Sequence, residues 1–228
     1  MGRKLPVPVM IDEGELMAFQ GWPEEALDFY DGLEADNSRT YWLAHKDVYE
    51  TCVYGPMAAL MEELEPDHGE TKIYRPYRDL RFSRDKTPYK TAIGAHCGEG
   101  YVQLSAAGLA AGTGMYGMSS DQLERYRSAV AADASGSRLE DVITTLRKQD
   151  IDVHGRDSLK SAPRGYPPDH PRIELLRHKG LVAWKEWPVE PWLATAKAKN
   201  VVSDFLIVSR PLNDWLAQHV GPADDARR

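Results

Sequence analysis

Residues 71–90 concentrate positive charge in an otherwise acidic chain. The segment reads TKIYRPYRDLRFSRDKTPYK and holds seven lysines and arginines against two aspartates, whereas the whole chain has a formal net charge of −7. Arginine offers a rigid fork of donors that matches two oxygens of a carboxylate or phosphate, and it stays charged when partly desolvated. The interleaved aromatic residues can stack on guanidinium planes or on a ring of a ligand. The segment therefore predicts an anion-binding site.

The predicted site combines this segment with one later turn. Arg164 stands between a proline and a glycine, a turn context that would aim its side chain. Three cations, Arg78, Arg81 and Lys86, are expected to hold the anion. Tyr89 and Lys90 are expected to frame it, and Asp79 to orient an arginine. The residues expected to contact or frame the ligand are Arg75, Arg78, Asp79, Arg81, Lys86, Tyr89, Lys90 and Arg164.

The local conformation of the segment is predicted from its alternation. Leu80 and Phe82 are expected to point from a short strand into the core, so Asp79 and Arg81 would share the opposite face. Residues 83–90 are expected to form a loop, because Pro88 opposes continued strand pairing.

The chemistry of the charged segment leaves alternatives open. The ligand would be a small molecule carrying phosphate or carboxylate, and the site would belong to a binding protein or to an enzyme of undefined reaction. Alternatively, the basic strip contacts a nucleic-acid backbone or an acidic protein, without catalysis. A third interpretation is a purely structural ion-pair network, since clusters of charge mark both functional sites and scaffolds.

Other motifs add little chemistry. The two cysteines form no C-x-x-C pair, none of the seven histidines falls in H-E-x-x-H, and no phosphate-binding G-x-x-x-x-G-K-[ST] occurs. We therefore predict no metal and no cofactor. Gly112-Thr113-Gly114 is expected to form a tight hairpin, and the tryptophans near Pro188 and Pro191 are expected to close the edge of the core.

The predicted fold is α+β, with a central, mainly antiparallel sheet and helices packed on it. Short glycine-separated segments between helical flanks support this prediction. Strands are expected at 72–74, 80–82, 91–96, 101–105, 109–118, 151–153 and 181–187. Helices are expected at 23–33, through 42–53, and at 57–64, 120–132, 138–148, 171–178, 189–198 and 201–220, with Pro211 kinking or splitting the last one.

The chain is expected to form a single domain over residues 19–220, with a flexible leader at 1–18 and a polar tail at 221–228. Its 228 residues and 42% hydrophobic content suffice for one substantial core. No apolar run reaches the length of a signal peptide or a membrane span. We expect a cytoplasmic protein that does not bind membranes.

Several blocks of sequence share an unusual composition with a known family. The blocks are Gly21-Trp22, Asp36-Asn37-Ser38-Arg39 with Trp42 and His45-Lys46, residues 78–91, Leu159-Lys160, and Pro163-Arg164-Gly165-Tyr166 with Asp169-His170-Pro171. Over about residues 19–187 the chain resembles the bacterial and fungal domain of unknown function 2461. It departs from the family pattern at Ser38, where asparagine is more usual, and at Asp157-Ser158, where Gly-Glu is more typical. The resemblance implies no particular activity.

Overall fold

The computed structural model describes residues 18–79, 81 and 86–224. Its centre is a six-stranded sheet in the order β1-β2-β3-β4-β6-β5, and every neighbouring pair is antiparallel. The α+β prediction is confirmed. The strands are β1 (Thr71–Ile73), β2 (Ala92–Cys97), β3 (Gly100–Ser105), β4 (Gly108–Met115), β5 (Asp152–His154) and β6 (Leu181–Trp187).

Alternating burial along the strands gives the sheet two different faces. In β3, Val102 and Leu104 are fully buried, whereas the residues that alternate with them, Tyr101, Gln103 and Ser105, are only partly buried. Two-residue turns join β2 to β3 and β3 to β4, which fixes the register of the three strands. One set of alternate residues therefore faces the core, and the other lines the opposite face.

Five helical segments, separated by short breaks or none, precede the sheet. They are α1 (Glu24–Ala35), α2 (Arg39–Ala44), α3 (Lys46–Val48), the π-helical segment η1 (Tyr49–Tyr54) and α4 (Gly55–His68). Ser38 begins α2, since its side chain accepts a hydrogen bond from the Tyr41 amide at 3.1 Å. Pro56 lies in the first turn of α4, where its missing N–H is tolerated.

The C-terminal helices correct two expectations. They are α5 (Ser120–Ala131), α6 (Asp133–Arg147), α7 (Ile173–Arg177), the 3-10 turn η2 (Pro191–Ala194) and α8 (Lys197–His219). The prediction of a helix over 189–198 is wrong, because only η2 forms within most of that range. The Leu193 carbonyl of η2 instead accepts a hydrogen bond from the Trp22 amide at 2.8 Å. Pro211 does not split α8, since buried residues on both sides of it, including Phe205 and Trp215, hold the helix in place.

The expected hairpin at Gly112-Thr113-Gly114 is also wrong. These residues continue β4, paired with Trp184, Ala183 and Val182 of β6. Gly114 has φ +115, and a Cβ there would meet the Leu181 carbonyl oxygen. The glycines therefore permit close approach of two paired strands rather than a chain reversal.

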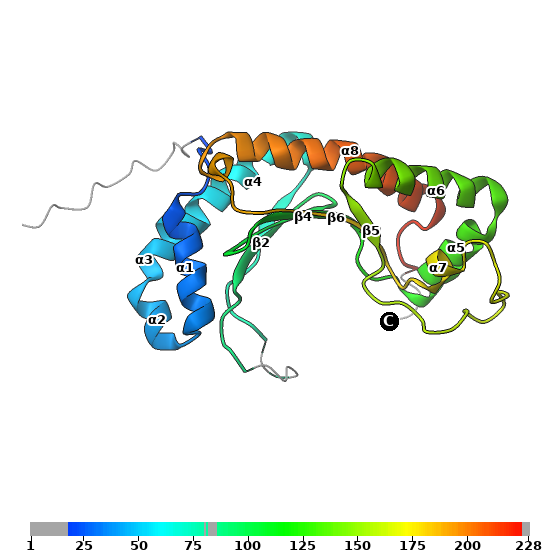
Figure 1. The fold of residues 1–228 in the computed structure, drawn as a ribbon, viewed down its shortest axis with the longest axis horizontal. Coiled ribbons are helices and arrows are strands. Elements are labelled where there is room, and N and C mark those ends of the chain that lie inside the picture. The colour runs from blue at the N-terminus through cyan, green and yellow to red at the C-terminus, as the bar shows by residue number, and fades with distance from the viewer. Residues whose placement is uncertain (1–17, 80, 82–85, 225–228) are drawn as a thin grey trace, which may run out of the picture.

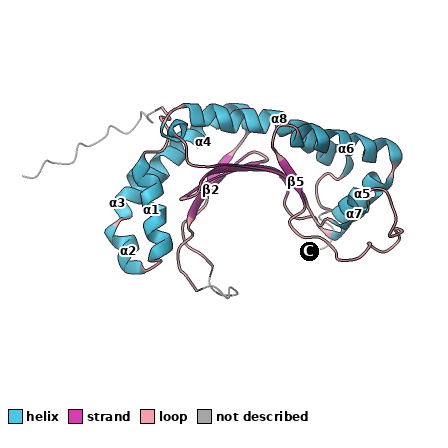
Figure 2. Cartoon of the chain, viewed as in Figure 1, coloured by secondary structure: helices cyan, strands magenta, loops and turns pink. Residues whose placement is uncertain are grey.

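Within the described part of the chain, the helices leave one face of the sheet uncovered. Helix α4 packs on β2 and α8 packs on β4, both on the same side. Figures 1 and 2 show the strands arching beneath these helices, with α1–α3 at one end of the arch and α5–α7 at the other. The buried hydrophobic residues, from Phe19 to Val220, form one contiguous core. Among the described residues, no helix combines the length and apolar composition needed to cross a lipid bilayer.

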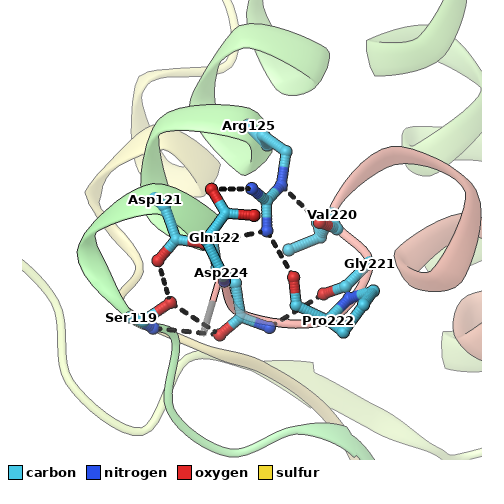
Figure 3. A network of polar contacts seen from close by, with 8 residues as sticks. All are labelled: Ser119, Asp121, Gln122, Arg125, Val220, Gly221, Pro222 and Asp224. Carbon is cyan, nitrogen blue, oxygen red and sulfur yellow. Dashed lines mark hydrogen bonds and ion pairs between the residues drawn. The ribbon is translucent and has the colours of Figure 1, made fainter. Parts of the chain in front are cut away.

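Polar contacts tie the end of α8 to α5 (Figure 3). Arg125 donates hydrogen bonds of 2.6 Å to the carbonyl oxygens of Val220 and Pro222. Its guanidinium also lies 3.1 Å from an oxygen of Asp121, which accepts a hydrogen bond from the Asp224 amide at 2.8 Å. The Ser119 hydroxyl also donates a hydrogen bond to Asp121, and this bond, followed by the one from the Asp224 amide, lowers the pKa of the Asp121 carboxyl. The described residues beyond α8 are thus fastened to the body of the protein.

Candidate functional site

The described residues of 74–90 (74–79, 81 and 86–90) are here called the basic arm, and their pairing extends β1 and β2 beyond the sheet. Tyr77 pairs with Tyr89, the Arg78 amide donates to the Pro88 carbonyl at 2.9 Å, and the Lys90 amide donates to the Pro76 carbonyl at 2.8 Å. Of the residues expected to form a loop, 86–88 and 90 belong to no strand, and Pro88 takes part in the pairing through its carbonyl alone, as Pro76 does. The expected strand at 80–82 falls largely outside the described residues, as do Leu80 and Phe82 themselves.

The arm is anchored to the N-terminal helices through Tyr89. Tyr89 is 5% exposed, and its ring stacks on Trp42, with centroids 4.4 Å apart and planes 6° apart. Asn37 accepts a hydrogen bond from the Tyr89 amide at 3.0 Å and donates one to its carbonyl at 3.1 Å. The residue that the sequence places beside an anion therefore has its ring in the core.

The predicted pairing of an aspartate with an arginine occurs on the arm itself. Arg81 donates two hydrogen bonds to Asp79, of 3.0 and 2.7 Å. These bonds lower the pKa of the Asp79 carboxyl and raise that of the Arg81 guanidinium. Both side chains are exposed, so the pair contributes little to stability. Arg75 and Lys86 are exposed on the same arm, and Arg78 is half-buried.

Lys90 stands at the junction of the arm and the sheet. Its ammonium lies 5.4 Å from the centre of the Tyr74 ring. Partial burial lowers the pKa of Lys90, and the positive charge of Arg75 lowers it further. An anion bound here would offset both effects, because it favours the charged form of the lysine.

The uncovered sheet face holds a cavity of about 790 Å³, here called the trough. Lys90 and Tyr74 line it from the arm, and side chains of every strand from β2 to β6 complete it. Its other lining residues are His96, Glu99, Tyr101, Gln103, Gly112, Thr113, Gly114, Tyr116, His154, Val182, Trp184 and Glu186. A second hollow of about 250 Å³ adjoins it beyond Gln103 and Glu186.

Glycines make the floor of the trough flat. A Cβ at Gly112 would lie 2.5 Å from Cε3 of Trp184, and one at Gly94 would overlap the Tyr101 hydroxyl. The two large rings therefore lie over backbone, with their centroids 6.2 Å apart and their planes 24° apart. We call Tyr101 and Trp184 the aromatic platform. Such a surface suits a planar or ring-shaped group, because every ring offers a face for stacking.

Polar side chains border the platform. Trp184 donates its indole N–H to Glu186 at 2.8 Å, and the Tyr101 hydroxyl donates to Gln103 at 3.1 Å. Burial raises the pKa of Tyr101, so its hydroxyl stays protonated at neutral pH and remains a donor. At the β5 edge, Nδ1 of His154 lies 2.8 Å from an oxygen of Asp152.

The structure brings only part of the predicted site together. Lys90 is the one predicted residue among the trough-lining side chains of the described chain. Arg164 is exposed in the segment between β5 and α7, which lies at the α5–α7 end of the molecule, whereas the basic arm hangs from the α1–α3 end (Figure 1). Arg164 is therefore not beside Arg78 and Arg81.

The two residues of the aromatic platform, Tyr101 and Trp184, are not among the site residues predicted from the sequence. A signal for it exists in the alternation of Tyr101 and Gln103 with buried Val102 and Leu104, and of Trp184 and Glu186 in β6. The glycines of neighbouring strands mark the same face. Reading these signals as one site requires the strand register, which brings Tyr101 opposite Gly112 and Gly112 opposite Trp184.

Together, the fold and site define an α+β protein whose antiparallel sheet carries helices on one face and an open, aromatic-floored trough on the other. The chain matches the model of the family described as conserved hypothetical protein (DUF2461) over residues 25–215, and it belongs to that family. The resemblance seen in the sequence is thereby confirmed. No curated protein and no solved structure matches the chain significantly.

Proposed function

We propose that the trough binds a small ligand that combines a ring with a phosphate or carboxylate group. The ring lies on the aromatic platform, and Lys90 binds the anionic group. The observation that carries this proposal is the presence of a partly desolvated lysine and a flat pair of aromatic rings in one cavity of about 790 Å³. Pockets of this volume suit ligands of the size of a metabolite or cofactor.

Charge supports a ligand with few negative groups. Glu99 and Glu186 line the trough, so a polyanion lying along its floor would be repelled. The arm supplies the opposite sign at one end, where Arg75, Arg78 and Lys86 add to the positive potential around Lys90. We propose that these cations steer the anionic end of the ligand to the arm and leave the neutral ring to the platform.

The first experiment measures ligand affinity by isothermal titration calorimetry with 1-naphthyl phosphate. The expected result is saturable binding that exceeds that of inorganic phosphate or 1-naphthol alone. Lys90→Gln and Trp184→Ala should each weaken it about tenfold or more, since each removes one of the two contacts. Lys160→Gln, in an exposed segment outside the trough, is the matched control and should leave the affinity within about twofold.

The affinity should also depend on pH in a defined direction. The anion needs the charged lysine, and the pKa of Lys90 is lowered in the free protein. Affinity should therefore fall with rising pH, and it should begin to fall below the range in which an ordinary lysine, with a pKa of about 10.4, loses its proton.

Other outcomes would overturn the proposal. If inorganic phosphate binds as well as 1-naphthyl phosphate, or if Trp184→Ala is without effect, the platform is not a ligand site. If a single-stranded oligonucleotide binds instead, with a steep salt dependence and a loss on Arg78→Gln but not on Lys90→Gln, the basic arm is a backbone-binding surface.

A further inference from the structure

His154 differs from the other histidine that lines the trough. His154 and Asp152 are two residues apart on β5, so they share a face, and Nδ1 of the ring is 2.8 Å from the Asp152 carboxylate. His96 instead contacts the rings of Tyr74 and Tyr101 edge-on, with centroids 5.4 Å away in each case. Only His154 therefore combines a place in the cavity with an orienting carboxylate.

This arrangement fixes how the His154 ring can react. A carboxylate bonded to Nδ1 holds the proton on that nitrogen, which leaves Nε2 with its lone pair available as a base. The His154 side chain is 44% exposed, so water and ligand can reach it. The strand is held in place by its pairing with β6, which sets Asp152 opposite Trp184 and His154 opposite Val182.

A nearby histidine shows the contrast between a structural and a reactive ring. His178 is held by Ser158, whose hydroxyl is 2.7 Å from Nδ1, across an antiparallel bridge between the two residues. Burial lowers the pKa of His178, and the neighbouring His154 lowers it further. His178 does not line the trough, so this pair serves to hold the chain after β5.

We propose that the trough is catalytic and that His154, oriented by Asp152, is the general base of an ester hydrolase. This inference rests on the proposed function, since the substrate occupies the trough. His154 Nε2 takes a proton from a water molecule while the oxygen of that water bonds to the ester carbonyl carbon. The bond from that carbon to the alcohol oxygen then breaks, and the imidazolium returns its proton to the leaving alkoxide. The products are a carboxylic acid and an alcohol, and no other reactant is needed.

The positions of Lys90 and His154 define the shape of the substrate. Lys90 lies two residues before the start of β2, and four strand-to-strand steps, about 19 Å in total along the sheet backbone, separate β2 from β5. An anionic group held by Lys90 and an ester bond at His154 must therefore lie far apart in one molecule. The substrate class is an elongated ester with a carboxylate or phosphate at the end remote from the bond that is cleaved.

The experiment compares release of 4-nitrophenol from 4-nitrophenyl acetate and from the mono-4-nitrophenyl ester of sebacic acid, which has a distant carboxylate. The expected result is saturable hydrolysis with a higher kcat/KM for the sebacate ester. His154→Gln should lower kcat at least tenfold for both esters. Lys90→Gln should raise KM for the sebacate ester alone, because only that ester reaches the arm.

Asp152 is a positioning residue and needs a different readout. Asp152→Asn should lower kcat and change the pH profile of kcat/KM, since it removes the negative charge beside His154 and leaves His178 as a neighbouring titratable group. Asp152→Glu should restore part of the rate. A purely structural aspartate would leave the pH profile unchanged. His219→Gln, in the last turn of α8 beside Trp215, is the control and should keep the wild-type rate.

The proposal fails if no saturable hydrolysis occurs with either ester, or if His154→Gln and His219→Gln behave alike. Calorimetry of the wild type with 1-naphthyl phosphate distinguishes failure of the catalytic inference from failure of the proposed binding function. Retained binding without hydrolysis in the wild type would overturn the catalytic inference and leave the binding function intact. If the wild type does not bind 1-naphthyl phosphate, both the binding function and the catalytic inference are overturned.

Discussion

At the scale of single residues, the site depends on positions that have no side chain. Gly94 and Gly112 give the rings of Tyr101 and Trp184 room to lie against the backbone. A substituent at either position would lift a ring into the space that the proposed ligand occupies. In the proposed site the glycines serve binding through the shape they allow, and Lys90 and His154 have the proposed roles of anion contact and base.

Gly112→Ala tests this role directly. The added methyl group would crowd Trp184, so we expect the free energy of unfolding to fall by about 1–2 kcal/mol and 1-naphthyl phosphate to bind more weakly. Gly117→Ala is the matched control, because a Cβ there meets no atom within 4 Å. Urea melts and calorimetry measure the two effects. Equal behaviour of both variants would show that the Trp184 ring has no need of the glycine.

At the scale of elements, the basic arm is a paired extension of two strands and its position depends on helix α2. Asn37, which precedes α2, bonds both backbone groups of Tyr89, and Trp42 stacks on the Tyr89 ring. Lys90 follows directly in the chain. The placement of the proposed anion contact therefore depends on residues that do not touch the trough.

Asn37→Ala should loosen the arm. The Tyr89 amide and carbonyl would lose their partners in a partly buried place, which costs roughly 1–3 kcal/mol. We expect a lower stability in urea melts together with weaker binding of 1-naphthyl phosphate, although the trough lining is unchanged. Asn200→Ala, exposed on α8, should stay within about 0.5 kcal/mol of the wild type. Wild-type affinity in Asn37→Ala would contradict the coupling.

The elements were more predictable than the site. Strands with alternating or continuous apolar residues, such as β3 and β6, follow from local pattern, and so do the helices with caps or apolar stripes. The failure at 189–198 arises where tertiary contacts override local preference, and buried contacts on both sides of Pro211 likewise keep α8 unsplit. The basic arm was recognised by its charge, which is a local property. The aromatic platform joins β3 to β6 through β4, and no local pattern reports such a pairing.

At the scale of the whole molecule, one long helix spans the arch and joins its two ends. Helix α8 packs on β4 near the middle and contacts both α4 and α6. Its last residues are fastened to α5 by Arg125, Asp121 and Gln122 (Figure 3). These polar contacts hold the residues beyond α8 against α5, beside the buried contacts through which α8 packs on α5 and α6.

Arg125→Gln should loosen the described residues beyond α8. We expect the amides of residues 220–224 to exchange with deuterium about tenfold faster or more, because the arginine holds two of their carbonyl oxygens. Arg127→Gln on the same helix is the control, since that arginine bonds the Leu176 carbonyl instead. Exchange measured by mass spectrometry distinguishes the variants. Similar rates in both would mean that Gln122 and Asp121 suffice to hold the segment.

The flat floor of the trough also constrains how the sequence can change over time. Gly112 and Trp184 face each other on one rung of the sheet, so a side chain at the first position is incompatible with a flat indole at the second. Among related chains the two positions should change together, with a larger residue at 112 accompanied by a smaller or differently shaped one at 184. Gly94 and Tyr101 form a second such pair. Lineages in which both pairs keep their shape are those expected to share a ligand.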